Sequence, residues 1–158
     1  MARATDTVNW LRDDEMAAWR SFVETQADLM SAIENDLAPS GLTLGDYQVL
    51  VYLTEADDQR MRMCDLAERL QLSPSGLTRR LDGLVKAGWV ERRNSDADRR
   101  VMLAALTDTG RQQLADAAPG HVESVRARMI DVLDADDQRA IAQAFAKIRL
   151  ALDRTEGA

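Results

Sequence analysis

Apolar residues recur along most of the chain at steps of three and four, the spacing that places side chains on one face of an α-helix. The first such run covers residues 10–37, and Pro39 and Gly41 then end it. Thr43 offers an N-cap for a second helix over residues 44–55, which the polar segment EADDQR follows. We therefore expect one long amphipathic helix and then one short core helix.

The next segment has the pattern of two helices joined by a short turn. A helix over residues 63–70 precedes the turn QLS, and Ser73 with Pro74 has the N-cap and first-turn chemistry of a further helix, residues 74–87, which Gly88 ends. The leucines that share one face of this helix, and that we expect in the core, are Leu77, Leu81 and Leu84. The residues left on its other sides are Ser75, Gly76, Thr78, Arg79 and Arg80.

The hydrophobic period changes after Gly88, where WVERR and RVMLAAL have the pattern of extended strands. The residues between them, NSDAD, favour a turn, so this part of the chain is predicted to form a β-hairpin. Helical spacing returns over residues 107–132, although Pro119 and Gly120 are expected to kink or break that helix. Residues 134–137, DADD, resemble a capping box at the start of a last helix.

Helix, helix, short turn, helix and hairpin, in this order, make a winged helix-turn-helix. The predicted fold is mainly α with a small β-hairpin. Residues 43–107 form the winged lobe, and helices over residues 10–37 and 108–153 flank it. Because no internal repeat or long linker is visible, we interpret residues 1–158 as a single domain.

The charge is distributed unevenly along the chain, whose formal net charge is −7. From Arg69 to Arg100 there are eight Lys or Arg against four Asp or Glu, a balance of +4, while the remainder holds 12 against 23, a balance of −11. A basic segment inside an acidic chain is typical of a polyanion-binding face. A charged face exposed only to solvent is the alternative that charge alone leaves open.

Because an α-helix fits the major groove of DNA, we expect the start of helix 74–87 to read base edges. Its natural readers are Ser75, Thr78, Arg79 and Arg80. The tip of the hairpin over residues 91–101 could reach a neighbouring minor groove. Two arginine pairs flank this tip: Arg92, Arg93, Arg99 and Arg100. Asp98 is expected to hold a neighbouring arginine in one rotamer. A turn-forming Asp98 with a solvated carboxylate is the alternative.

Few residues are available for catalysis or for metal binding. Cys64 is the only cysteine and His121 the only histidine, so neither a His-rich zinc site nor a nucleophile with its base is visible. We expect no metal, no cofactor and no enzyme activity. Cys64 starts a helix, where partial burial or a Ser-like cap is one interpretation and a lowered thiol pKa the other. No apolar run reaches the ~20 residues of a membrane span, and the N-terminus lacks a signal peptide, so we expect a cytoplasmic protein.

Residues 61–110, MRMCDLAERLQLSPSGLTRRLDGLVKAGWVERRNSDADRRVMLAALTDTG, resemble the MarR family of bacterial transcriptional regulators. The wing of that family carries an Asp-x-Arg motif, which falls here on Asp98, Arg99 and Arg100. A strand that ends in LT and a helix with a TxxG-like start follow it, here at Leu106, Thr107 and Gly110. The residues that the pattern and the resemblance together assign to DNA contacts are Ser73, Ser75, Gly76, Thr78, Arg79, Arg80, Asp98, Arg99 and Arg100.

The resemblance also implies a homodimer, formed through helices 10–37, 108–133 and 135–153. Such a dimer reads a pseudo-palindromic operator whose half-sites lie about one helical turn, ~34 to 36 Å, apart. Dimer formation would bury apolar residues that a monomer exposes, among them Trp10, Trp19, Ile141, Phe145 and Ile148. An intramolecular core would serve some of these residues equally well.

Many relatives lose DNA affinity when a small aromatic or phenolic anion enters a cleft beside the DNA-binding lobe. The resemblance therefore implies a repressor with such an effector, whose site is assigned to Trp19, Tyr47, Tyr52 and His121. Ordinary core packing also accounts for the aromatic residues. A winged helix that docks on another protein is a further alternative, although it does not require arginines on the recognition helix and the wing.

Overall fold

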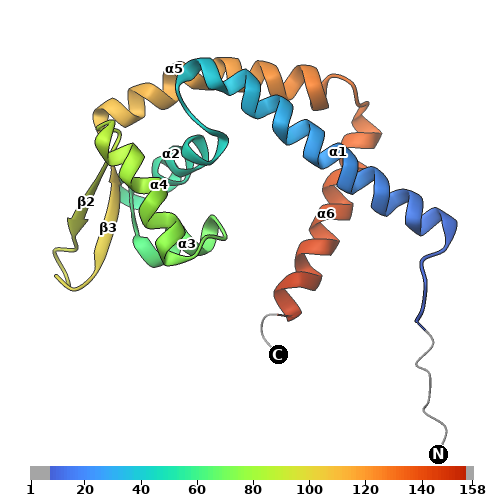
Figure 1. Cartoon of the computed structure of the whole chain (residues 1–158), viewed down its shortest axis with the longest axis horizontal. Helices are drawn as coiled ribbons and strands as arrows, with labels where there is room; N and C mark the ends of the chain where they lie inside the picture. Colours follow the sequence, from blue (N-terminus) through green and yellow to red (C-terminus); the bar gives the residue numbers. More distant parts are fainter. Residues whose placement is uncertain (1–7, 156–158) are drawn as a thin grey trace, which may run out of the picture.

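The computed structural model describes residues 8–155 and consists of helices around a small antiparallel sheet (Figure 1). The main helices are α1 (Asp13–Leu37), α2 (Leu44–Glu55), α3 (Met63–Arg69), α4 (Pro74–Lys86), α5 (Asp108–Val125) and α6 (Ala135–Thr155). The short helical segments are η1 (Ala38–Ser40), η2 (Asp57–Gln59) and the π-helical η3 (Arg126–Ile130). The strands are β1 (Arg60–Arg62), β2 (Val90–Asn94) and β3 (Met102–Leu106). The predicted fold class, mainly α with a small sheet, is confirmed.

The sheet has three strands, whereas the sequence predicted a two-stranded hairpin. Strand β3 is central and pairs antiparallel with β1 on one side and β2 on the other. Ala104 therefore lies opposite Met61 of β1 and Arg92 of β2. Strand β1 was missed because three residues are too few to show an alternating pattern, and its extended conformation depends on the pairing with β3.

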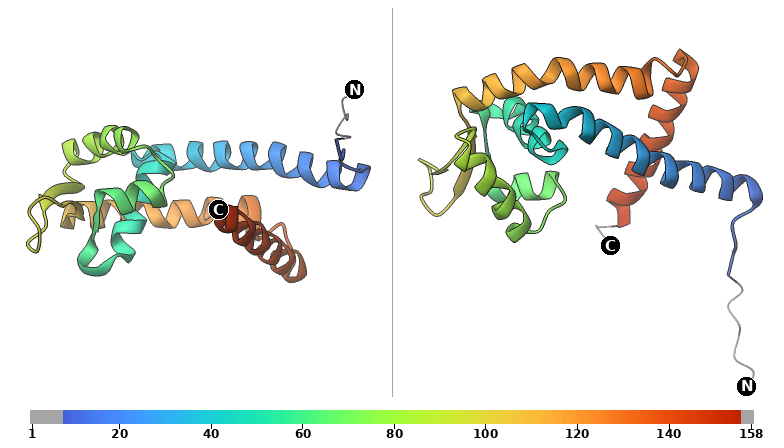
Figure 2. Two further views of the ribbon diagram at one scale, coloured as in Figure 1. Left: turned by 90° about the horizontal axis from the view of Figure 1, so that it is seen from below. Right: turned by 45° about the horizontal axis from the view of Figure 1, so that its top comes forward.

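The winged lobe, α2 to β3, lies at one end of the molecule, and the N-terminal end of α1 lies at the other (Figures 1 and 2). Helices α1 and α5 contact each other along the structure, and α5 also packs on α2. After η3 the chain turns into α6, where Phe145 contacts Phe22 of α1 with ring centroids 5.6 Å apart. The long helices therefore extend away from the lobe.

The core lies mainly inside the winged lobe, is built mostly from aliphatic side chains, and extends to Leu37 of α1 and Ala117 of α5. The largest fully buried side chains are Val49, Leu50, Leu53, Leu66, Leu77, Leu81, Leu84 and Val90. The three leucines that spacing predicted for the core face of α4 are thus buried. Each fully buried leucine stabilises the fold by about 1.5–3 kcal/mol, so this row fixes which side of α4 faces outward.

Side-chain caps begin three of the helices at the positions that the sequence suggests. Thr43 accepts a hydrogen bond from the backbone N–H of Asp46 at 3.1 Å. Ser73 accepts one from Gly76 at 3.1 Å, and Thr107 accepts one from Gly110 at 3.0 Å. The Asp134 carboxylate likewise accepts from the backbone of residues 136 and 137, as expected of the DADD segment.

The predicted start of α1 is wrong, and of the kink or break expected at Pro119 and Gly120 the break is absent. Helix α1 begins at Asp13 and not at residue 10, because acidic residues fill its first turn and Glu15 accepts a hydrogen bond of 2.9 Å from the Arg12 backbone. Helix α5 does not break at Pro119 but continues to Val125, where a π-helical turn follows. A proline removes only one helical hydrogen bond, and the residues on either side of it, Ala117 and Ser124, are buried.

Candidate nucleic-acid interface

Helix α4 has one buried face and one polar face. Opposite its leucines, Ser75, Thr78 and Arg79 are exposed near the N-terminal end of the helix. The Thr78 hydroxyl donates to the Pro74 carbonyl at 2.9 Å, and the hydroxyls of Ser73 and Ser75 lie 3.2 Å apart. These short polar side chains leave the start of α4 narrow, which suits a helix that enters a groove.

The two arginines of α4 differ in their surroundings. Within the described part of the chain, the exposed Arg79 guanidinium has no hydrogen bond or ion pair. The Arg80 guanidinium instead lies against α2, where Nη1 donates to the Thr43 hydroxyl at 3.1 Å and to Asp46 at 3.2 Å. The sequence assigned both residues to base reading, but only Arg79 has its guanidinium free in this structure.

The wing tip carries two further exposed arginines. The Arg100 side chain is 94% exposed, and its Nε lies 3.5 Å from the Asp98 carboxylate. The same carboxylate accepts a hydrogen bond from the Arg100 backbone at 3.0 Å, while Asn94 donates to the Arg99 carbonyl at 2.6 Å. Both interpretations of Asp98, orienting an arginine and forming the turn, thus have a geometric counterpart.

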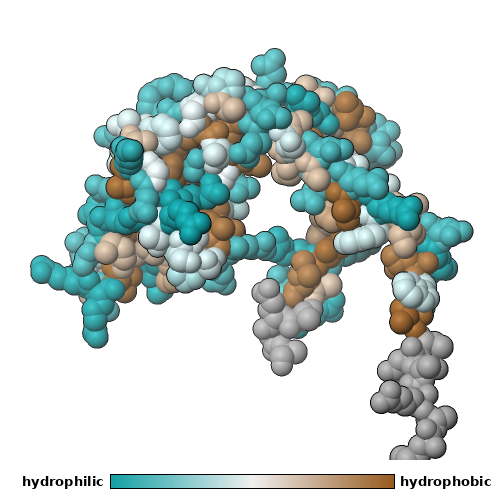
Figure 3. Space-filling model, in the orientation of Figure 1, coloured by the Kyte–Doolittle hydropathy of each residue, from teal (hydrophilic) through white to brown (hydrophobic). Residues whose placement is uncertain are grey.

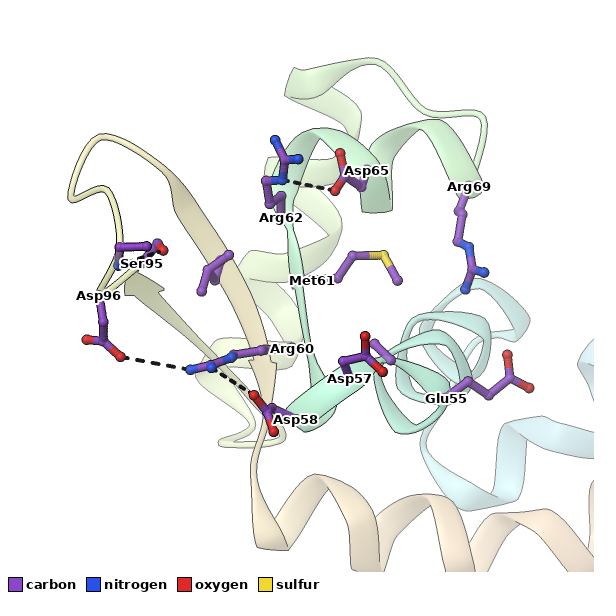
Figure 4. Close-up of a pocket in the computed structure, with 13 residues that line it drawn as sticks. Glu55, Asp57, Asp58, Arg60, Met61, Arg62, Asp65, Arg69, Ser95 and Asp96 are labelled. Atoms are coloured by element: carbon purple, nitrogen blue, oxygen red, sulfur yellow. Dashed lines mark hydrogen bonds and ion pairs between the residues drawn. The ribbon is translucent and has the colours of Figure 1, made fainter.

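Ion pairs connect β1 with the segment before it, with the start of α3 and with the wing loop (Figure 4). Arg60 of β1 contacts Asp58 at 2.8 Å and reaches Asp96 of the wing at 4.0 Å, and Arg62 contacts Asp65 at 3.3 Å. Asp96, an acid that looks misplaced beside DNA, therefore has a structural partner. Sequence reasoning missed Arg60 because β1 looked like part of a loop.

A second link joins the wing to α4. Arg92 of β2 donates a hydrogen bond to the Thr78 carbonyl at 2.8 Å and contacts Asp82 at 2.8 Å. Its side chain is 28% exposed, against 45% for Arg93, whose guanidinium contacts, among the described residues, only the Glu91 carboxylate of its own strand. Arg92 therefore fixes the wing relative to α4, a role that spacing in the sequence does not reveal.

Comparisons with known proteins agree with this geometry. Residues 40–101 match a family model described as MarR family. The crystal structure of AbsC, a MarR family regulator from Streptomyces coelicolor, has a TM-score of 0.87 at 40% identity over 91% of this chain and 97% of that one. The chain belongs to the MarR family.

Two further relatives agree with this membership. Sco3205 from Streptomyces coelicolor, solved in complex with DNA, has a TM-score of 0.86 at 33% identity over 90% of this chain and 94% of that one. The repressor YetL from Bacillus subtilis is 31% identical over 72% of this chain and 68% of its own length. As a member of the MarR family, the chain is a DNA-binding transcriptional regulator and not an enzyme.

The described residues offer this MarR-family protein no metal site, since they contain no group of three or more His, Cys, Asp or Glu that could hold an ion. Cys64 is exposed and not partly buried, and its thiol donates to Asp65 at 3.2 Å. No helix between residues 8 and 155 combines the length and the apolar character that a membrane span needs.

The four residues assigned to an effector cleft lie in three different places. Tyr47 is buried and packs on His121 of α5, with ring centroids 4.3 Å apart. Trp19 lies beside Phe22 on the exposed part of α1, whereas Tyr52 carries the guanidinium of Arg69 over its ring at 5.3 Å. Burial lowers the pKa of His121, so this residue is neutral near pH 7 and offers no cation to an anionic ligand.

Proposed function

We propose that this regulator acts as a homodimeric repressor that reads a pseudo-palindromic operator. In this proposal α4, the recognition helix of residues 74–87, enters the major groove, and the wing of residues 91–101 enters the adjacent minor groove. The observation that carries the proposal is the free guanidinium of Arg79 on the outward face of α4. Arginine is the side chain that most often contacts guanine in the major groove.

The wing supplies the second contact. Arg99 and Arg100 are exposed at its tip, and Arg92 fixes the strand that carries them to α4. Arginine inserted into a minor groove responds to its width and negative potential more than to base identity. We therefore expect Arg79 to determine base preference, and Arg100 to add affinity that depends on DNA shape.

Homodimer formation is supported by apolar side chains that the monomer leaves in water. These lie on α1 and α6 and before α1, and they include Trp10, Trp19, Phe22, Phe145, Ile148 and Leu152. Figure 3 shows hydrophobic patches along these helices, while the wing surface is hydrophilic. A second copy that covers the patches would also bring two recognition helices onto one duplex, as a two-fold operator requires.

The experiment that tests DNA reading is a fluorescence anisotropy titration of the protein against DNA from upstream of its own gene, with random duplex as competitor and a salt series. We expect saturable binding by two protomers per site, with an affinity that falls steeply as salt rises. Arg79→Ala should relax the preference for the operator, and Arg100→Ala should weaken binding without unfolding the dimer. Arg20→Ala is the matched control, because the Arg20 guanidinium on α1 is exposed and has no hydrogen bond or ion pair to any residue between 8 and 155.

Two results would count against this proposal. If genome-wide selection of bound fragments recovers no preferred sequence, α4 does not read bases, and a winged helix that docks on a protein becomes the better interpretation. If light scattering finds a monomer that binds one half-site, the operator is not read by a two-fold dimer. The parent protein should be a dimer, and the Phe145→Ser variant should be a monomer, because the substitution places a polar side chain in the apolar surface that we propose as the interface.

We further propose that a small aromatic or phenolic anion releases the DNA. Support comes from an apolar groove between α1 and the η3–α6 region, which Phe22, Met129 and Phe145 line together with Arg128, whose guanidinium is ion-paired with Asp36. Because Phe22 and Phe145 also belong to the surface proposed for the dimer, a ligand in this groove would act at the junction of the two protomers. A screen of aromatic carboxylates and phenols for loss of the anisotropy signal tests this, with direct binding measured by calorimetry. A ligand acts only through differential affinity for the DNA-competent state, so compounds that bind without releasing DNA do not support the proposal.

A further inference from the structure

We propose that Arg80 is a positioning residue and not a base reader: together with Thr43, Asp46 and Gly45 it forms a clasp that fixes α4 on α2 and so determines how α4 meets DNA. The proposal rests on the proposed function of α4 as the recognition helix. Thr43, Gly45 and Asp46, which lie at the start of α2 and outside the recognition helix and the wing, would then influence base preference.

The clasp is made by direct polar contacts at the N-terminal end of α2. Nη1 of Arg80 lies 3.1 Å from the Thr43 hydroxyl and 3.2 Å from Oδ1 of Asp46. The second carboxylate oxygen of Asp46 accepts from the Thr43 backbone at 3.2 Å and from its hydroxyl at 2.6 Å. Asp46 therefore caps α2 with one oxygen and holds the recognition helix with the other.

Partial burial makes this pair different from the other ion pairs of the lobe. The Arg80 side chain is 32% exposed and that of Asp46 is 21% exposed. The guanidinium also lies at the positive end of the α2 dipole, which repels a cation. Since the Asp46 carboxylate offsets that repulsion and neutralises the local charge, Arg80 in the clasp attracts phosphate less than the unpaired Arg79 does.

Gly45 provides the space for the guanidinium. A Cβ built on Gly45 would lie 2.3 Å from Nη1 and 2.4 Å from Cζ of Arg80. Gly45 is the second residue of α2, where glycine destabilises a helix relative to alanine. The backbone there has no positive φ that would require glycine. Room for Arg80 is therefore the physical reason for glycine at this position.

The contacts of Arg80 restrict a motion of α4 that the buried leucines leave open, namely rotation about the helix axis. Leu77, Leu81 and Leu84 fix α4 against the core, but apolar contacts are not directional and allow a helix to roll by a small angle. A hydrogen-bonded guanidinium at residue 80 opposes that roll. The neighbouring Arg79 must meet a base edge within a fraction of an ångström, so a small roll changes which base it prefers.

The test is Gly45→Ala, because it displaces Arg80 while both charges and the Thr43–Asp46 cap remain. The end of an arginine side chain can move, so the variant should fold, and thermal melting by circular dichroism checks this. We expect the preference for the operator over single-base variants to fall about tenfold. Gly120→Ala, where a Cβ meets nothing within 4 Å, is the matched control and should leave base preference unchanged.

Arg80→Ala supplies a second, independent readout. A positioning role predicts that its loss relaxes base preference but leaves the slope of log affinity against log salt unchanged, whereas the loss of a phosphate contact lowers that slope by about one. It also predicts that Gly45→Ala with Arg80→Ala is no worse than either single variant, because both remove the same clasp.

The opposite outcomes overturn the proposal. If Arg80 contacts DNA itself, it must first leave α2. Gly45→Ala would then bind the operator more tightly than the parent protein, because the substitution has already displaced Arg80 from α2. Unchanged base preference in a folded Gly45→Ala variant would also refute the clasp. A parent protein that shows no sequence preference at all would instead refute the proposed function, so the two failures can be told apart.

Discussion

The guanidinium of Arg92 in strand β2 donates a hydrogen bond of 2.8 Å to the main-chain carbonyl of Thr78 in helix α4. Through this bond and its contact with Asp82, a side chain of the wing holds the helix that precedes it in the chain. The wing is therefore fixed to α4, the proposed recognition helix, and we expect a change at their junction to affect both the stability of the lobe and the orientation of the wing relative to α4.

Arg92→Ala is expected to lower the free energy of unfolding by about 1 kcal/mol, since it removes a charge-assisted hydrogen bond at a site partly open to solvent. Urea denaturation monitored by circular dichroism measures the change. Arg93→Ala is the matched control on the same strand, because the Arg93 guanidinium pairs with the neighbouring Glu91 and is more exposed. An equal loss in both variants would show that the link to Thr78 adds nothing.

Gly110→Ala is expected to destabilise the protein by about 1–3 kcal/mol, because a Cβ there would lie 2.0 Å from the Trp89 carbonyl oxygen, which backbone restraint keeps in place. That carbonyl also accepts hydrogen bonds from Thr107, so the start of α5 cannot move away freely. Thermal unfolding tests this against Gly120→Ala, which has open space and should be neutral or stabilising. A neutral Gly110→Ala would contradict the close approach.

Asp36 of α1 is expected to make the free energy of unfolding fall at acidic pH. Hydrogen bonds from Arg128 at 2.7 and 2.9 Å and from Ser124 at 2.7 Å lower the pKa of Asp36 to about 2 from its ordinary 3.8. The unfolded chain therefore binds this proton first as the pH falls, and the stabilisation present above pH 3.8 is lost toward pH 2. Urea denaturation between pH 5 and 2 should show a steeper decline for the parent protein than for Asp36→Asn. Parallel curves would argue against this network.

His121 is expected to make the free energy of unfolding depend on pH in a higher range than Asp36 does. Burial lowers its pKa below the ordinary 6.5, so the unfolded chain protonates first and stability falls as the pH drops below about 6.5, until the folded protein is protonated as well. His121→Phe keeps a ring beside Tyr47 but cannot titrate, and should therefore flatten this part of the stability profile. Denaturation at pH 8 and at pH 5 measures the difference. A profile that His121→Phe leaves unchanged would contradict the assignment.

The helical pattern of the lobe could be predicted because its signals are local. The spacing of Leu77, Leu81 and Leu84, the caps at Thr43 and Ser73, and Gly88 with its φ of 77° each act within a few residues of the helix that they define. Local spacing and capping chemistry are therefore sufficient to find α2 and α4. The wing strands were recognisable for a similar reason, since polar turn residues separate two apolar runs.

What could not be predicted depends on contacts between distant residues. Strand β1 exists through its pairing with β3, and the link from Arg92 to Thr78 requires the folded lobe. The contact of Arg80 with Asp46 joins residues 34 positions apart, so spacing alone made Arg80 look like a reader equal to Arg79. The effector residues failed to converge for the same reason, because an aromatic side chain gives no local signal of its neighbours.

The link between Arg92 and α4 has a consequence for how such regulators diversify. Its acceptor is the main chain of Thr78, which every residue type provides, so the side chain at position 78 can change while the wing stays in place. The side chains of Ser75 and Arg79 are likewise absent from the buried core. Under the proposed role of α4, substitutions on its outer face can therefore change DNA specificity while the buried leucine row stays intact, and one scaffold can serve many different promoters.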